Sequence, residues 1–496
     1  MKQKKAGKPG LWKFGATACG AATLLLLPVD AYSTDVPAWL IVLLCAAMIF
    51  CVVMVWRNAS GKRLSRILAA IASGIVSVLA LYSCFFYPYW NSVSYRSSVP
   101  YTQPLSETLT PEQAREDIVY AYQMLRKTHP ALRGFVPEEL AQAAQEAHEA
   151  VRSSGQLSVA EVGQLVQQMA SVLDDAHTGI NLRNLENQRF LRTSGLHERR
   201  GDRLVAVNGV LIETWMEDKA SLLSFETPSW ERLMLEDYLV SDTGLQLLGF
   251  GSGGLEYTYE TADGETVTET AAPDDFVTLA VLQEITQAEY PPEEGAEAWV
   301  SYEIYPDQSL AVLTLRQCLN TAEYITCLRD MFTEVKSLGI RNVAVDLRSN
   351  GGGDSSVATE FMRYLDTDTY RQMGVKLRNG PLEITSPEQT IINERYTDLV
   401  FDGDVYVLTS PATFSSAMLF TEYLTDNGLA EQIGETPGNI ADGYGEVATF
   451  RLPNSGLLLG ISTKQFERLD EEAGRVLVPD EEVPADDALS ALLSRL

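Results

Sequence analysis

The sequence predicts an α/β protein with an N-terminal membrane anchor of three helices. Three observations lead to this prediction. Apolar stretches fill most of residues 1–90, helical periodicity begins at Thr110, and strand-like runs alternate with helix-like runs after residue 299. Strands that alternate with helices are typical of a mostly parallel sheet. We divide the chain into an anchor (1–90), a stalk (91–108), a helical subdomain (109–180), a small β-rich subdomain (181–298) and an α/β core (299–496).

Composition excludes several classes of function. The formal net charge of −29 disfavours nucleic-acid binding, which requires basic surfaces. Six cysteines are too few for a disulfide scaffold in a chain of 496 residues, and the spacing of Cys318 and Cys327 matches no metal or redox motif. Cys318 and Cys327 remain candidates for a bridge outside the cell. We expect no cofactor and no metal, and the sequence does not fix the oligomeric state.

Three apolar segments form the predicted anchor, at about 11–27, 38–56 and 67–89. Each approaches or reaches the ~20 residues with which a helix crosses a bilayer. The first segment is the weakest, and a signal peptide is the alternative interpretation of it. These segments contain no Asp, Glu or His, so they offer no residue for transport or proton relay. They are interpreted as an anchor.

The distribution of charge predicts how the anchor is oriented. Basic residues precede the first segment and fill the second connection: Lys2, Lys4, Lys5, Lys8, Arg57, Lys62, Arg63 and Arg66. The first connection, around residues 30–37, contains Asp30 and Asp35 and no Lys or Arg. Positive charge stays on the cytoplasmic side. The prediction is a multi-pass protein with a cytoplasmic N-terminus and an extracytoplasmic chain after Tyr89.

The helical subdomain ends in the candidate general base. Helices are predicted from Thr110 to about Lys127, from Pro137 to Arg152 and from Ser158 to Leu173. His177 follows the third helix, between acidic residues and a Thr-Gly pair that leave room to orient an imidazole. A structural histidine is the commoner occurrence, so this position alone decides nothing.

The β-rich subdomain contains a candidate peptide-binding motif. Residues Gly201–Glu213 form two short strands joined at Asn208-Gly209, a type I′ turn signal. This run resembles the last strands of a PDZ module, in which a peptide adds to a sheet edge. The rest of the subdomain does not follow the PDZ pattern, so a degenerate substitute is the alternative.

Two turns of the α/β core are candidates for a catalytic site. Gly351, Gly352 and Gly353 lie between a buried strand (343–346) and a helix, where backbone N–H groups can hold an anion. Neither a P-loop nor a dinucleotide-binding pattern is present. Ser415 lies where the next strand (405–408) gives way to a helix N-terminus, which favours developing negative charge. Serine is also a common helix cap.

The segments DLRSNGGG, VYVLTSPATFSSAMLF and IGETPGN, in this order, resemble the C-terminal-processing (tail-specific) serine peptidase family. That family includes the tricorn core protease and retinoid-binding relatives. DAHTG (175–179), HPALRGF (129–135) and VLVPDEEV (476–483) extend the similarity, which covers about residue 110 to the C-terminus. The resemblance implies a ClpP/crotonase-like core and a protein or peptide substrate.

The family has two catalytic versions, and the sequence selects one of them. The lysine of the serine–lysine version would fall near Ile440, in a loop that contains no lysine. The resemblance therefore implies Ser415 as nucleophile and His177 as general base. Ser416 is the rival nucleophile, although the motif makes its amide an oxyanion donor. Gly353 is the implied second donor, with Gly352 as its alternative.

The third catalytic residue is implied by the Pro479-Asp480 landmark, which the acid shortly precedes in histidine-using relatives. Glu472 fits this position best, and Glu471 and Asp470 are the alternatives. Met418 stands where many relatives have glutamate, a change that removes no catalytic group.

The sequence as a whole favours a membrane-anchored extracytoplasmic serine endopeptidase with a Ser-His-acid arrangement. Retention of Ser415, His177 and the glycine turn supports catalysis. The alternative is a non-catalytic peptide- or ligand-binding module on the same fold. A sensor that relays signals through the spans is a third possibility, which the absence of a predicted cytoplasmic domain disfavours.

Overall fold

The computed structural model describes residues 9–32, 38–58, 63–85, 88–93, 103–182, 188–251, 254–291 and 298–496. Two predicted features lie wholly or partly outside these residues. They are the acidic first connection, at residues 30–37, and the middle of the predicted stalk, at residues 94–102.

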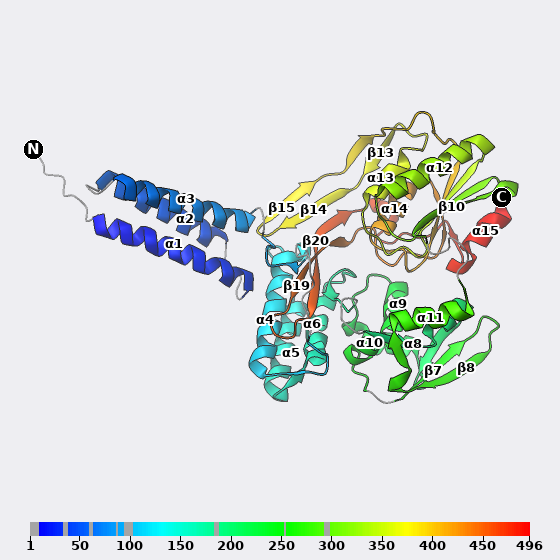
Figure 1. The fold of residues 1–496 in the computed structure, drawn as a ribbon, viewed down its shortest axis with the longest axis horizontal. Coiled ribbons are helices and arrows are strands. Elements are labelled where there is room, and N and C mark those ends of the chain that lie inside the picture. Colours follow the sequence, from blue (N-terminus) through cyan, green and yellow to red (C-terminus); the bar gives the residue numbers. More distant parts are fainter. Residues whose placement is uncertain are drawn as a thin grey trace, which may run out of the picture.

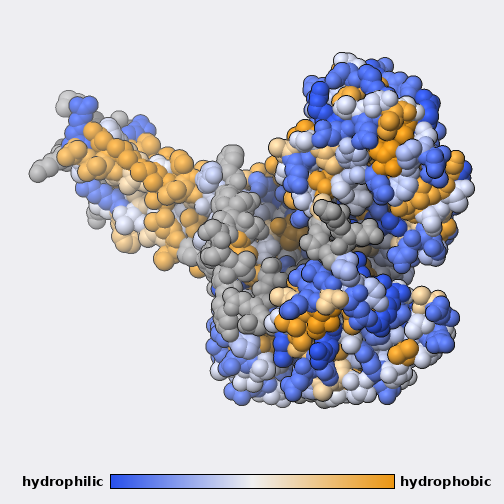
Figure 2. All heavy atoms as spheres, turned by 45° about the vertical axis from the view of Figure 1, so that its right-hand side comes forward, coloured by the Kyte–Doolittle hydropathy of each residue, from blue (hydrophilic) through white to orange (hydrophobic). Residues whose placement is uncertain are grey.

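Three long apolar helices open the chain: α1 (Pro9–Tyr32), α2 (Ala38–Asn58) and α3 (Arg63–Phe85). They lie side by side and extend away from the rest of the molecule (Figure 1). Each is long and apolar enough to cross a membrane. Large apolar side chains such as Phe14, Leu25 and Val78 are about seven-tenths exposed, and they give the bundle the apolar surface seen in Figure 2.

The predicted helical subdomain consists of α4 (Pro111–Thr128), α5 (Glu138–Ser154) and α6 (Val159–Ser171), together with the short pair β1 (Thr108–Leu109) and β2 (Leu157–Ser158). Capping boxes start α4 and α6. Thr110 exchanges hydrogen bonds with Gln113, and Ser158 with Glu161, which satisfies free N–H groups of the first turn. In the predicted stalk, Leu105 packs against this subdomain, and the N–H of Gln103 donates to the Ser455 carbonyl at 2.9 Å.

Residues 188–291 form a separate layer with its own core. An antiparallel sheet has the order β6 (Val210–Leu211), β5 (Arg203–Val207), β7 (Leu255–Glu260), β8 (Thr266–Ala271), and β4 (Arg189–Leu191) pairs with β9 (Phe276–Thr278). The helices are α7 (Ser194–Arg200), α8 (Ile212–Lys219), α9 (Pro228–Leu239), α10 (Asp242–Leu247) and α11 (Leu279–Glu289). The turns at Asn208-Gly209 and Asp263-Gly264 are as predicted, since both lie between paired strands.

The α/β core is built on a six-stranded sheet. Its order is β10 (Val300–Tyr305), β11 (Leu310–Leu315), β12 (Asn342–Asp346), β17 (Asp404–Thr409), β18 (Glu431–Gly434), β21 (Glu481–Glu482). All neighbours from β11 to β21 run parallel, and β10 is antiparallel. Helices α12 (Ala322–Leu338), α13 (Ser356–Met362) and α14 (Ser416–Thr425) share one apolar core with the sheet, and α15 (Ala488–Arg495) belongs to a second. The prediction of a mostly parallel sheet is confirmed.

A second sheet joins the core to the helical subdomain. Its order is β15 (Leu382–Ser386), β14 (Gly374–Asn379), β20 (Leu458–Glu467), β19 (Tyr444–Arg451), and a separate pair is formed by β13 (Thr369–Gln372) and β16 (Gln389–Ile392). The short strand β3 (Gly179–Ile180) pairs with β20. Apolar residues of β19 and β20 pack against α4–α6, so the strand that follows His177 is fixed to the core.

The hairpin of β14 and β15 lies next to the end of α3 (Figure 1). The Tyr89 hydroxyl donates to the Arg378 carbonyl at 2.8 Å and accepts from the N–H of Gly380 at 3.1 Å. The side-chain amide of Asn379 donates to the Phe85 carbonyl at 2.7 Å. The first helical bundle is thus hydrogen-bonded directly to the folded domain that follows it.

Candidate active site

Ser415 lies between β17 and α14, as the sequence predicts. Its φ of 55° and ψ of −123° are unusual for a residue that has a side chain, and such a conformation costs about 1–3 kcal/mol. The surrounding hydrogen bonds hold it. The N–H of Ser415 donates to Oδ1 of Asn439 at 2.6 Å, and the N–H of Phe414 donates to the Asn350 carbonyl at 2.9 Å.

His177 comes to Ser415 from the end of the helical subdomain. Its N–H donates to Oδ1 of Asp175 at 2.9 Å, and its ring lies against Phe414 with 4.5 Å between ring centroids. Phe414 in turn stacks on Trp230. Only 9% of the His177 side chain is exposed, and neither ring nitrogen has a hydrogen-bond partner among the described residues. The imidazole is positioned by packing, with both nitrogens available.

Ser415 and His177 line one cavity of about 510 Å³. The structure therefore brings together the two residues predicted as nucleophile and base. The remaining lining includes apolar side chains from α14, the 440 loop and the second sheet: Met418, Leu419, Ile440, Ala441, Val447 and Phe466.

Gly353 and Ser416, the predicted oxyanion donors, also line this cavity. No hydrogen-bond acceptor for either backbone N–H is present in the part of the chain that the structure describes. The Ser416 hydroxyl donates to the Gly353 carbonyl at 2.6 Å, which ties the two turns together. Gly352 is less suited to donate, because its N–H is already bonded to Oδ1 of Asn350 at 2.9 Å. Two free N–H groups near a serine are the arrangement that stabilises an oxyanion.

Asp175 is the carboxylate nearest to the histidine. One of its oxygens lies 3.7 Å from Nδ1 of His177. The other is within 3.1 Å of Nε2 of His129 and accepts from the Thr178 hydroxyl at 2.6 Å. Although burial opposes ionisation, the hydrogen bond from His129 and the nearby His177 hold the pKa of Asp175 well below its usual range. Asp175 is a permanent negative charge beneath the imidazole.

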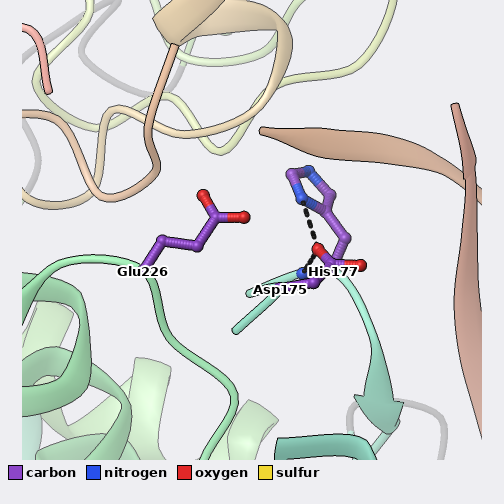
Figure 3. Close-up of side chains that lie close together, drawn as sticks. All are labelled: Asp175, His177 and Glu226. Atoms are coloured by element: carbon purple, nitrogen blue, oxygen red, sulfur yellow. Dashed lines mark hydrogen bonds and ion pairs between the residues drawn. The ribbon is translucent and has the colours of Figure 1, made fainter. Parts of the chain in front are cut away.

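Glu226 is a second carboxylate at the site, and sequence reasoning missed it. It comes from the subdomain of residues 188–291, just before α9, and its carboxylate points toward Asp175 and His177 (Figure 3). Polar atoms of these three side chains all lie within 4.8 Å of one another. Burial and the charge of Asp175 raise the pKa of Glu226 to about 7. The short string FETPSW carries no catalytic motif, so only the tertiary structure identifies this residue.

Glu472, the predicted third catalytic residue, is not at the site. It lies exposed in a short 3₁₀ turn (Glu471–Ala473), and it does not line the cavity. Asp470 is exposed too and accepts the N–H of Glu472 at 3.1 Å. The landmark of relatives predicted a position by sequence distance alone. In this structure that position faces solvent, and Asp175 and Glu226 occupy the surroundings of the histidine.

Among the described residues, Asp175, His177 and Glu226 also have side-chain atoms close enough together to hold a metal ion. Both oxygens of Asp175 are engaged by hydrogen-bond donors of the protein, and both oxygens of Glu226 accept backbone N–H groups. A metal would have to displace several of these bonds. The arrangement is better suited to handling a proton than to holding a cation.

Ile440 lies near the position that the sequence predicts for the lysine of the other catalytic version. It is buried, and its N–H donates to Glu226 at 2.9 Å. Lys464 also lines the cavity, but its ammonium group is paired with Glu446 at 3.3 Å. The geometry therefore favours the histidine as base.

The sequence also left open whether Cys318 and Cys327 form a bridge. In the structure both are free thiols.

Comparisons with known proteins show which family and which solved structures this chain is similar to. Residues 309–483 match the model of peptidase family S41. Mature CPAF and its complex with lactacystin each share 12% identity with this chain and cover 78% of it, with TM-scores of 0.53 and 0.54 and 95% and 96% of their own chains covered. The photosystem II D1 C-terminal processing protease shares 14% identity over 77% of this chain and 96% of its own, with a TM-score of 0.44. A search of curated proteins found no match.

Proposed function

We propose that this chain, which carries a peptidase family S41 domain and is a serine-type peptidase, is anchored in a membrane and cleaves proteins or peptides on the extracytoplasmic side. It works through the histidine-using version of the family's chemistry. The observation that carries the proposal is the shared cavity. Ser415, His177 and two backbone N–H groups that have no acceptor among the described residues all line it, and they come from three distant segments.

The proposed mechanism follows from these groups. His177 accepts the proton of the Ser415 hydroxyl as the oxygen attacks the scissile carbonyl, and later gives it to the leaving amine. The N–H groups of Gly353 and Ser416 stabilise the oxyanion. Asp175 holds the His177 loop through its bond to the backbone N–H, and its charge favours the imidazolium. We therefore assign the acid role to Asp175 in place of Glu472.

The location is inferred from the anchor. Three apolar helices precede the peptidase, and the sequence asymmetry of Lys and Arg favours a cytoplasmic N-terminus and an extracytoplasmic cavity. The contacts of Tyr89 and Asn379 support a peptidase held at the membrane surface. We further assign the six-stranded unit to the ClpP/crotonase-like fold and the β-rich subdomain to a PDZ-like or degenerate module.

A fluorophosphonate probe tests the proposal on the full chain in detergent, because such probes react only with activated serines. Wild-type protein is expected to be labelled, and Ser415→Ala and His177→Ala are expected to lose labelling. Ser416→Ala is the matched control, since its hydroxyl serves as a bond to Gly353. Ser415 should still be labelled in this variant, at a lower rate than in the wild type.

Two further results would decide against the proposal. If labelling persisted in Ser415→Ala and disappeared in Ser416→Ala, the nucleophile would be Ser416 and not Ser415. A folded wild type that is neither labelled nor able to digest an unfolded protein would favour a non-catalytic binding module on the same fold.

A further inference from the structure

We propose that Glu226, contributed by residues 188–291, is a positioning residue for His177 and that its negative charge promotes catalysis, which makes the activity depend on the docking of this subdomain. The inference rests on the proposed function and deepens it by naming a regulatory dependence of the same site. Glu226 lies outside the segment that matches the S41 family.

The first step is geometric. Oε2 of Glu226 accepts the N–H of Ile440 at 2.9 Å, and Oε1 accepts the N–H of Ala176 at 3.4 Å. Ala176 immediately precedes His177, and Ile440 immediately follows Asn439, which holds Ser415. One carboxylate therefore connects the histidine loop to the loop that fixes the nucleophile.

Two neighbours of Glu226 reinforce this connection. The Thr227 hydroxyl donates to the Gly438 carbonyl at 2.9 Å. Trp230 stacks on Phe414 with 4.1 Å between centroids, and Phe414 packs against the imidazole. Residues 226–230 thus contact the segments that carry Ser415, His177 and Asn439, the residue that accepts the Ser415 N–H. Undocking the subdomain would release all three contacts.

The second step is electrostatic. The groups that face Glu226 are Asp175, which repels its charge, His177, which attracts it, and the N–H groups of Ile440 and Ala176. Tyr444, on β19, interacts electrostatically with Glu226, and also with Asp442 and Arg475. When His177 takes the serine proton, the imidazolium lies beside two carboxylates, and an ionised Glu226 stabilises it.

The charge of Glu226 changes within the working range of pH. Its pKa of about 7 leaves it mostly neutral at pH 5–6 and ionised at pH 8. A neutral carboxyl resembles glutamine in shape and charge. The contribution of Glu226 to catalysis is therefore expected only above about pH 7, whereas a purely structural role would not follow its ionisation.

The experiment measures the rate of fluorophosphonate labelling of the full chain in detergent from pH 5 to pH 9. Glu226→Gln is expected to react at nearly the wild-type rate at pH 5.5 and about tenfold more slowly at pH 8, because at pH 8 only the wild type has an ionised carboxylate beside the imidazolium. Glu231→Gln is the matched control. Glu231 is a buried glutamate of the same subdomain, in α9, and is absent from the cavity lining, so this variant should follow the wild type at every pH.

Equal rates for Glu226→Gln and wild type over the whole range would overturn the proposal. If Glu226→Gln were slower than the wild type by the same factor at every pH, the proposed effect of its charge would also be overturned, and only a structural role would be left. Where Glu226→Gln lowers Tm, Glu226→Asp replaces it. That variant keeps the charge, so its rate should rise with pH more steeply than that of Glu226→Gln, and identical profiles would refute the proposal. An unlabelled wild type would instead refute the proposed function, and this inference with it.

Discussion

The backbone N–H of Ser415 donates a 2.6 Å hydrogen bond to Oδ1 of Asn439. Asn439 is buried, and it lies on the same loop as Ile440 and Gly438, both of which are bonded to residues 226–227. The unusual φ of Ser415 is thus stabilised by a loop that is hydrogen-bonded to a different subdomain. Through this loop, the proposed nucleophile is connected to a part of the chain outside the S41 domain.

Asn439→Ala is expected to reduce fluorophosphonate labelling roughly tenfold, because the hydroxyl of Ser415, the proposed nucleophile, loses its fixed position. It also leaves the N–H of Ser415 unpaired, at a cost of about 1–3 kcal/mol. Labelling rate and Tm measure the two effects. Asn393→Ala is the control, since the buried amide of Asn393 bonds the Met362 and Thr367 carbonyls away from the cavity. It should lower Tm and leave the labelling rate of folded protein unchanged.

Gly352→Ala should abolish activity, whereas Gly351→Ala should not. A Cβ at Gly352 would lie 2.7 Å from Cβ of Ser415 and 2.9 Å from the N–H nitrogen of Ser416, and φ is +102°. Displacing these groups removes oxyanion stabilisation, with a loss of about 100-fold or more in kcat. At Gly351 nothing lies within 4 Å of the added atom. Comparable digestion of an unfolded protein by the two variants would contradict the assigned turn.

The stability of the core should fall as the pH rises through about 8. Burial and the charge of Asp426 raise the pKa of Glu422 from 4.5 to about 8, and one of its oxygens has no hydrogen-bond partner among the described residues. Because the folded state holds this proton more tightly, the stabilising contribution is complete below pH 4.5 and is lost as pH passes 8. Glu422→Gln should exceed the wild type in stability at pH 9 by about 2 kcal/mol or more.

Thermal or urea unfolding at pH 5 and pH 9 checks this prediction. Glu394→Gln serves as the control because Glu394 is exposed, and it should match the wild type at both values of pH. A wild type whose stability is the same at pH 5 and pH 9, with no gain in Glu422→Gln, would show that the carboxyl is not buried in its neutral form.

Tyr89→Phe should loosen the contact between the segment that follows α3 and the β14–β15 hairpin without reducing labelling. The variant loses the bonds to the Arg378 carbonyl and the Gly380 N–H, each worth about 1 kcal/mol. Faster hydrogen exchange in the β14–β15 hairpin would report the change. Tyr305→Phe is the control, because it removes an exposed hydrogen bond to Glu303 at the edge of the core sheet. In this variant the β14–β15 hairpin should exchange as in the wild type. Unchanged exchange in Tyr89→Phe would mean that these bonds do not hold the hairpin.

The sequence by itself determined the features that depend on local pattern. The apolar runs predicted three helices long enough to span a membrane, and β-branched runs followed by turn residues predicted the strands around Ser415 and Gly353. Periodicity and capping signals are written into neighbouring residues. For the same reason the turns at Gly209 and Gly264 were predictable.

Only the tertiary structure decided which charges surround the histidine. Glu472 was predicted from its distance to a landmark, yet sequence distance does not fix where a side chain points, and it faces solvent. Glu226 reaches the site across a subdomain boundary, and Asp175 owes its low pKa to His129, which lies far from it in the sequence. Burial and long-range pairing set these properties, and neither is encoded in the residues that flank them.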